Sequence, residues 1–109
     1  MSELLHDRVV LVTGGGSGLG AAICRELAAE SAIVVAADLR VEGAEEVVRG
    51  INDRGGRAIA LTADVGEAAQ GRALVERTLD QFGSLDVLIN NAGTDVTLPL
   101  DELSIEHWD

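Results

Sequence analysis

The chain has 109 residues, 47% of them hydrophobic and 25% charged, which is the composition of a globular domain and not of a disordered chain. Its formal net charge of -11 argues against nucleic acid or an anionic membrane surface as a partner. Cys24 is the single cysteine, so no intrachain disulfide is possible and a reducing, cytoplasmic location is expected. His6 and His107 stand apart in the sequence, and we therefore expect no metal site.

Taken in chain order, the hydrophobic pattern alternates between continuous apolar runs and helical periodicity. The apolar runs predict strands buried on both faces, at residues 9–12, 32–37, 58–63 and 85–89. Between them, apolar residues at helical spacing predict helices at residues 18–30, 41–54 and 67–82. Leu19 and Leu79 belong to the predicted inward stripes of the first and third helices. Residues 92–103 predict a loop, and Ser104 is the expected N-cap of a further helix.

Strands that alternate with helices indicate a parallel sheet with right-handed crossovers. The sequence therefore predicts an α/β fold with a doubly wound sheet of about four strands in the order 3-2-1-4. In this order the fourth strand lies at the end of the sheet, and we expect its outer edge to be open.

A glycine-rich turn, TGGGSGLG from Thr13 to Gly20, joins the first strand to the first helix. Ligands of such sheets lie beyond the carboxyl ends of the strands, where this turn is expected. Without a Cβ atom at Gly14, Gly18 and Gly20, backbone N–H groups can approach an anion, and the helix directs its positive end to the same place. The turn therefore predicts a pyrophosphate site, with a purely structural turn as the alternative. No Gly-Lys-Ser/Thr follows, so the turn is not a P-loop.

Two acidic residues follow the second and third predicted strands. Asp38 comes 18 residues after Gly20, the last glycine of the turn. A dinucleotide site has, about 20 residues on, an acid that accepts hydrogen bonds from the adenosine ribose. Its carboxylate would repel a 2′-phosphate, so NAD is favoured over NADP, although Arg40 weakens this preference. Asp64 is expected to contact the adenine edge, with Val65 as an apolar wall. For both acids the alternative role is a helix N-cap.

The fourth predicted strand ends in two adjacent amides, in the sequence Asn90-Asn91-Ala92-Gly93. Asparagine can brace backbone groups that leave a sheet, or it can contact a ligand at the same edge. The sequence leaves both interpretations open.

These segments resemble the classical short-chain dehydrogenases/reductases. The turn matches their TGxxxGxG pattern, Asn90 to Gly93 match NNAG, and Asp64-Val65 match the pair that contacts adenine. The resemblance implies a Rossmann-like fold in which residues 1–109 are the N-terminal, cofactor-binding part of a single domain. It also implies an NAD-dependent, homo-oligomeric oxidoreductase that transfers hydride between a nicotinamide cofactor and an alcohol or carbonyl substrate.

By this resemblance the cofactor-binding residues are Gly14, Ser17, Gly18, Leu19, Gly20, Asp38, Asp64, Val65, Asn91, Ala92 and Gly93. Family members also carry a catalytic Asn, Ser, Tyr and Lys, but this chain contains no Tyr and no Lys. We therefore expect no catalytic residue in it and interpret it as the N-terminal fragment of an oxidoreductase, incomplete for catalysis. A stand-alone NAD(H)-binding module without catalysis is the alternative.

Overall fold

The structure is a computed structural model that describes residues 5–16, 18–64, 68–91 and 96–99. Its strands are β1 (Val9–Thr13), β2 (Ile33–Asp38), β3 (Arg57–Thr62), β4 (Val87–Asn90) and β5 (Val96–Pro99). Its helices are α1 (Gly18–Ala29), α2 (Val41–Asp53) and α3 (Ala68–Phe82). The helix expected at Ser104 lies outside the described residues.

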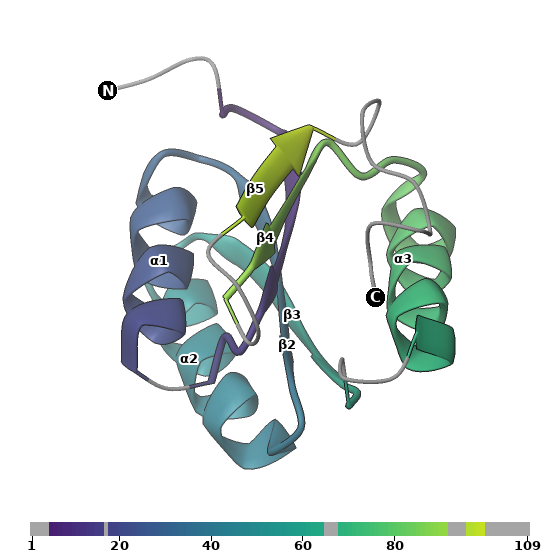
Figure 1. Cartoon of the computed structure of the whole chain (residues 1–109). Coiled ribbons are helices and arrows are strands. Elements are labelled where there is room, and N and C mark those ends of the chain that lie inside the picture. Colours follow the sequence, from purple (N-terminus) through teal and green to yellow (C-terminus); the bar gives the residue numbers. More distant parts are fainter. Residues whose placement is uncertain (1–4, 17, 65–67, 92–95, 100–109) are drawn as a thin grey trace.

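The strands form one sheet in the order β3-β2-β1-β4-β5, and the first four are parallel. This confirms the predicted α/β fold and the predicted order of the four parallel strands. Helices α1 and α2 cover one face of the sheet and α3 covers the other, as Figure 1 shows. The sheet is therefore doubly wound, with a hydrophobic core on each face.

Strand β1 contributes to both cores, and all five of its side chains are buried. Val10 and Val12 face α1 and α2, whereas Val9 and Leu11 face α3. Successive side chains of a strand point to opposite faces, so a strand covered on both sides needs an unbroken apolar run. Burying each Val or Leu stabilises the fold by roughly 1.5–3 kcal/mol, and this run therefore fixes β1 in the sheet interior.

The prediction of a loop throughout residues 92–103 was wrong. Val96–Pro99 forms β5, which pairs antiparallel with β4 from Asn90↔Val96 to Val87↔Pro99. The outer edge of β4 is consequently covered and not open. The physical reason is that an unpaired strand edge attracts any nearby segment able to extend, and the sequence VTLP has three residues compatible with a strand before its terminal proline.

Two predicted inward positions on the helices were also wrong. Leu19 in α1 is 63% exposed, and Leu79 in α3 is 37% exposed. The face of α1 that is buried carries the small residues Gly20, Ala21 and Cys24, because this helix begins close against the glycine turn. In α3 the buried face runs through Thr78, whose hydroxyl donates to the carbonyl oxygen of Leu74 at 2.8 Å and can therefore leave water.

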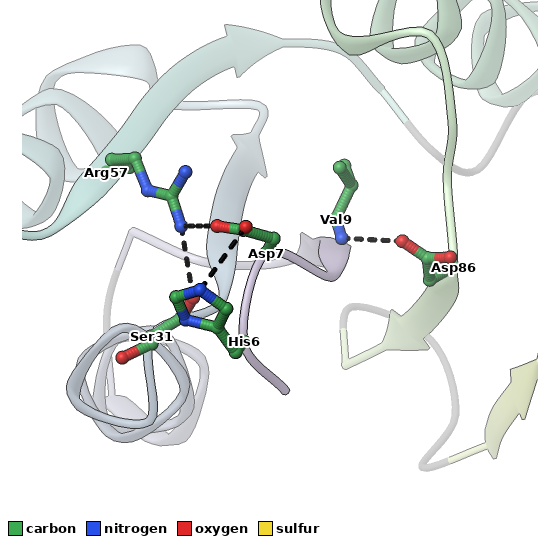
Figure 2. A network of polar contacts seen from close by, with 6 residues as sticks. All are labelled: His6, Asp7, Val9, Ser31, Arg57 and Asp86. Carbon is green, nitrogen blue, oxygen red and sulfur yellow. Dashed lines mark hydrogen bonds and ion pairs between the residues drawn. The ribbon is translucent and has the colours of Figure 1, made fainter. Parts of the chain in front are cut away.

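A polar network joins several segments at the amino ends of the strands (Figure 2). Arg57 at the start of β3 donates to the carboxylate of Asp7, and at 3.3 Å to the carbonyl oxygen of Ser31. This hydrogen bond from Arg57 lowers the pKa of Asp7 below its ordinary value of 3.8. On the neighbouring side, the N–H of Val9 donates to Asp86 at 2.8 Å. The network ties β1, β3 and the approach to β4 together at the end opposite the glycine turn.

Candidate functional site

The carboxyl ends of three neighbouring strands meet at one edge of the sheet. Thr13, the last residue of β1, pairs with Ala37 of β2 on one side and with Asn90 of β4 on the other. Asp38 lies one residue beyond this line, at the end of β2. The fold thus brings together the glycine turn, Asp38 and the paired amides, which are far apart in the sequence.

The glycine turn uses backbone conformations that favour glycine. Gly14 has a φ of 67° and Gly18 a φ of 56°, both in the left-handed region. Between them, the N–H of Gly15 donates to the carbonyl oxygen of Ala37 at 3.1 Å, so that the turn is fastened to the end of β2. The turn therefore has a defined position over the sheet edge.

Close packing also demands glycine at two positions of the turn and of the helix after it. A Cβ atom on Gly20 would lie 1.8 Å from the carbonyl oxygen of Gly14. On Gly16 it would lie 2.7 Å from the amide nitrogen of Ala44 and 2.9 Å from Oδ2 of Asp38. Both α1 and α2 consequently begin directly against the turn, with no side chain between backbone and backbone.

The carboxylate of Asp38 is fixed by two backbone groups. Its Oδ2 accepts from the N–H of Gly16 at 2.9 Å, and its Oδ1 accepts from the N–H of Arg40 at 3.1 Å. The N-cap residue of α2 is Arg40, and it makes no side-chain cap hydrogen bond. The alternative role of Asp38 as a helix N-cap was therefore wrong. Instead, this half-buried carboxylate connects the glycine turn to the segment between β2 and α2.

The two asparagines brace the other side of the turn. The Oδ1 atom of Asn90 accepts from the hydroxyl of Thr13 at 2.9 Å. The Nδ2 atom of Asn91 donates to the carbonyl oxygen of Gly14 at 3.4 Å. Both amides thus hold the turn to the end of β4, as the bracing interpretation predicts.

No site role is predicted for Thr13 from the sequence, and Cys24 is expected only as a small buried residue of a helix; both side chains support the turn. Thr13 is a fully buried polar residue at the end of an apolar run, and this change of polarity is the signal that could have marked it. The Sγ atom of Cys24 lies 4.0 Å from the carbonyl oxygen of Gly15. Burial raises the pKa of this thiol to about 12, so Cys24 fills space beneath the turn and is a poor nucleophile.

The remaining site residues of the sequence analysis divide into two groups. Leu19 is 63% exposed, and Asp64 is also exposed, with its N–H donating to Oε1 of Gln70 at 2.6 Å. Leu39, next to Asp38, is a second exposed apolar side chain, at 65%. The others lie outside the described residues: Ser17, Val65, Ala92 and Gly93.

Other features of the described residues lie away from this edge. A cavity of about 550 Å³ lies between the C-terminal halves of α1 and α2, and its lining includes Arg25 and Arg54. In residues 5–16, 18–64, 68–91 and 96–99 no group of three His, Cys, Asp or Glu converges as metal ligands would. Among the helices described, none has the length and apolar character needed to cross a membrane.

Comparison with known proteins identifies the family. A family model described as short chain dehydrogenase matches residues 8–109, and the chain therefore belongs to this family. It is 44% identical over 109 residues to cis-4-hydroxycyclohexanecarboxylate dehydrogenase of Sinomonas cyclohexanicum, in an alignment covering 99% of this chain and 43% of that protein.

Two solved structures resemble the fold closely. A metagenomic short-chain oxidoreductase in complex with NADP has a TM-score of 0.78 and 38% identity, covering 83% of this chain and 41% of that one. A short-chain dehydrogenase/reductase from Burkholderia phymatum in complex with NAD has a TM-score of 0.75 and 31% identity, covering 81% of this chain and 31% of that one. Both kinds of nicotinamide dinucleotide are thus bound by proteins of this fold.

The chain spans less than half the length of the curated relatives it matches. It covers 15%, 42% and 43% of three of them. The similarity is to the N-terminal part of such family members.

Proposed function

We propose that the glycine turn binds the pyrophosphate of a nicotinamide dinucleotide, and that the chain is the N-terminal, cofactor-binding part of an oxidoreductase acting on an alcohol or carbonyl substrate. The observation that carries this proposal is the turn itself. Gly14 and Gly18 have positive φ, and at Gly20 the backbone of α1 touches the turn without a side chain between them. Backbone N–H groups in such a turn can reach phosphate oxygens directly.

The start of α1 fits an anion for a second reason. The first turn of this 12-residue helix carries no acidic side chain, so nothing there neutralises its positive end. In a chain with 19 acidic residues, such an acid-free helix start is well suited to a pyrophosphate. When bound, the cofactor would supply hydride chemistry, and the residues of this chain would bind and orient it.

We further infer that the cofactor is NAD. Asp38 is held beside the turn by its bonds to Gly16 and Arg40, and this is the position of the ribose acceptor in a dinucleotide site. A fixed carboxylate can accept hydrogen bonds from ribose hydroxyls, and it would repel a 2′-phosphate. The same two bonds keep the carboxylate from turning away to admit NADP.

The other contacts of the cofactor are proposed from the family pattern. Ser17 and Leu19 would line the phosphates, Asp64 and Val65 the adenine, and residues 91–93 the central part of the cofactor. Leu19 and Leu39 are exposed at 63% and 65%, which suits apolar side chains that a ligand covers. We also propose that the complete oxidoreductase is a homo-oligomer and that it is cytoplasmic. The free thiol of Cys24 supports the cytoplasmic location.

Proton transfer to or from the substrate is not a task we assign to this chain. It has no Tyr and no Lys, and the family uses these two side chains for that step. General acid–base catalysis typically contributes about 10²–10⁴ in rate, so turnover requires residues beyond the ones present. A stand-alone binding module is not favoured, because a relative 44% identical to the chain is named as a dehydrogenase.

Calorimetric titration of the 109-residue chain with NAD and NADP tests the cofactor assignment. We expect NAD to bind at least about tenfold more tightly, a difference of about 1.4 kcal/mol. Asp38→Ala should weaken NAD binding and reduce the difference in affinity between NAD and NADP. It removes the acceptor for the ribose hydroxyls and also the repulsion of the 2′-phosphate. Asp38→Asn, which keeps an acceptor for the N–H of Gly16 but loses the charge, should narrow the gap with less loss of NAD affinity.

Asp53→Ala is the matched control, since it removes one negative charge from an exposed position at the far end of α2. It should leave both affinities unchanged. Tighter binding of NADP than of NAD by the unmodified chain would contradict the assignment.

A further inference from the structure

Strand β3 is the outermost strand on one side of the sheet, and its two edges differ. In a parallel strand, the N–H and C=O of one residue face one neighbour and those of the next residue face the other. Ala63, directly after β3, donates its N–H to the carbonyl oxygen of Asp38, so the odd-numbered residues face β2. The backbone groups of Ala58, Ala60 and Thr62 therefore face outward, along the edge that no strand of the described residues covers.

Asn52 occupies the first of these outward positions. Its Oδ1 accepts from the N–H of Ala58 at 3.0 Å, and its Nδ2 donates to the carbonyl oxygen of Ala58 at 3.2 Å. A primary amide offers the same donor and acceptor as the peptide group of an adjacent strand. The side chain of Asn52, from the last turn of α2, thus substitutes for a neighbouring strand at this point of the edge.

The rest of the edge has the properties of a pairing surface. Residues 58–63 read AIALTA and contain no charge, no proline and no glycine, which is the type of segment that adds strands. A groove of about 450 Å³ runs between α2 and β3, and its lining includes Ala60 together with Glu45, Arg49 and Asn52. An extended segment beside Ala60 would therefore find space as well as hydrogen-bonding groups.

We propose that the outer edge of β3 is a pairing surface for a second copy of this chain, and that Asn52 keeps this pairing weak. Arg57 precedes the uncharged segment and Asp64 follows it. Antiparallel pairing of two copies brings the Arg57 end of one beside the Asp64 end of the other, whereas parallel pairing aligns like charges. Arg57 also pairs with Asp7 of its own chain, but only the antiparallel arrangement keeps the two Arg57 side chains apart and the two Asp64 side chains apart. The charges at the two ends of the segment therefore favour a two-fold, antiparallel arrangement.

In that arrangement, centred on Ala60, the residue opposite Ala58 is Thr62 of the other copy. Asn52 already holds both backbone groups of Ala58. It therefore blocks the pair at each end of the two-fold ladder and leaves only the central pair. This proposal shares one residue with the proposed cofactor site, Asp64, whose charge favours the antiparallel arrangement. The pairing groups themselves, on Ala58, Ala60 and Thr62, belong to no proposed cofactor contact, so the two proposals can fail separately.

Sedimentation velocity of Asn52→Ala tests the proposal. The substitution frees the N–H and the C=O of Ala58 in each copy, four groups in the dimer, so the dimer dissociation constant should fall at least about tenfold relative to the unmodified chain. Asn52→Asp also loses the donor to Ala58, but it leaves a charge at the edge and should not dimerise. Asp80→Ala, at an exposed position of α3 on the other face of the sheet, serves as the control and should behave like the unmodified chain.

Adding Ala60→Pro to Asn52→Ala should return the chain to its original state of association. The N–H of Ala60 faces outward, so proline removes a bond from the new interface and none from the pairing with β2. Three results would each overturn the proposal: an unchanged dissociation constant in Asn52→Ala, equal dimerisation in Asn52→Asp, or no rescue by Ala60→Pro.

NMR spectra of the unmodified chain at several concentrations test the same proposal without a substitution at Asn52. This experiment also serves if the Asn52→Ala variant fails to fold. In the unmodified chain at high concentration, the amide resonances of Ala60 and Thr62 should shift with concentration, while those of Ile59 and Leu61, which face β2, should shift much less. Absence of any concentration-dependent shift at Ala60 and Thr62 would overturn the proposal as well.

Discussion

At the scale of single residues, Asp7 contributes to stability through its charge. The residue is exposed, has a φ of 62° and receives a hydrogen bond from Arg57 that lowers the pKa of its carboxyl. Asn accepts the left-handed conformation as readily as Asp does, so Asp7→Asn removes the charge without adding backbone strain. This substitution therefore isolates the electrostatic part of the network in Figure 2.

We predict that Asp7→Asn lowers the melting temperature at pH 7. The folded-state pKa of Asp7 is depressed, so its stabilisation is complete above the ordinary value of 3.8 and is lost as pH falls through the lower folded value. The difference in melting temperature between the two proteins should begin to shrink as the pH falls below 3.8 and should vanish below the folded-state pKa of Asp7. Added salt should reduce this difference at pH 7. Asp80→Asn, an exposed acid on α3, is the control; a gap independent of pH would refute this account.

The contacts of single residues were the least predictable part of the site. The sequence pattern predicted that Asp38 follows a strand, but it did not predict the bond from the N–H of Gly16, across 22 positions. That bond depends on how α2 approaches the turn, and Gly43 and Gly16 permit this approach by lacking side chains. Similarly, Leu19 fits the apolar period of α1, yet the small residues of the helix face the sheet.

At the scale of elements, the contact between α1 and the glycine turn is the feature most sensitive to substitution. Gly20→Ala would put a Cβ atom 1.8 Å from the carbonyl oxygen of Gly14, so α1 must move away from the turn. We predict a loss of stability of about 1–3 kcal/mol and a loss of dinucleotide binding. Thermal melting and calorimetric titration measure the two effects.

Gly50→Ala is the matched control, because a Cβ atom on this residue of α2 meets nothing within 4 Å. It should raise stability by roughly 0.5–1 kcal/mol, since alanine favours a helix more than glycine does, and it should leave binding unchanged. Equal effects of the two substitutions would mean that the close approach of α1 has no special role.

Helices and strands were predicted well where the hydrophobic pattern of the sequence was strong. The unbroken apolar runs at β1 and β2 admit few alternatives to a buried strand, and the double glycine at Gly55 and Gly56 marks the end of α2. Strand β5 was not predicted because its four residues are too few to show a hydrophobic pattern. It also depends on pairing with the edge of β4, which the local sequence does not show. Pairing of this kind belongs to tertiary structure and leaves little trace in the local sequence.

At the scale of the whole molecule, topology follows from a few constraints. Right-handed crossovers and helices on both faces leave few arrangements for four parallel strands, and this made the order 3-2-1-4 predictable. The same order puts β2, β1 and β4 side by side in the sheet (Figure 1). The glycine turn, Asp38 and the asparagines therefore meet at the carboxyl ends of these strands. The location of the candidate site is therefore a consequence of the topology.

The central claim is that a nicotinamide dinucleotide binds at this turn, and an NMR titration of the 109-residue chain with NAD tests it most directly. We predict saturable shifts of the backbone amides of Gly14, Gly16, Leu19 and Asp38, with little change at the amino ends of the strands. Shifts confined instead to the cavity between α1 and α2, at Arg25 and Arg54, or no saturable shift at the turn, would contradict the account.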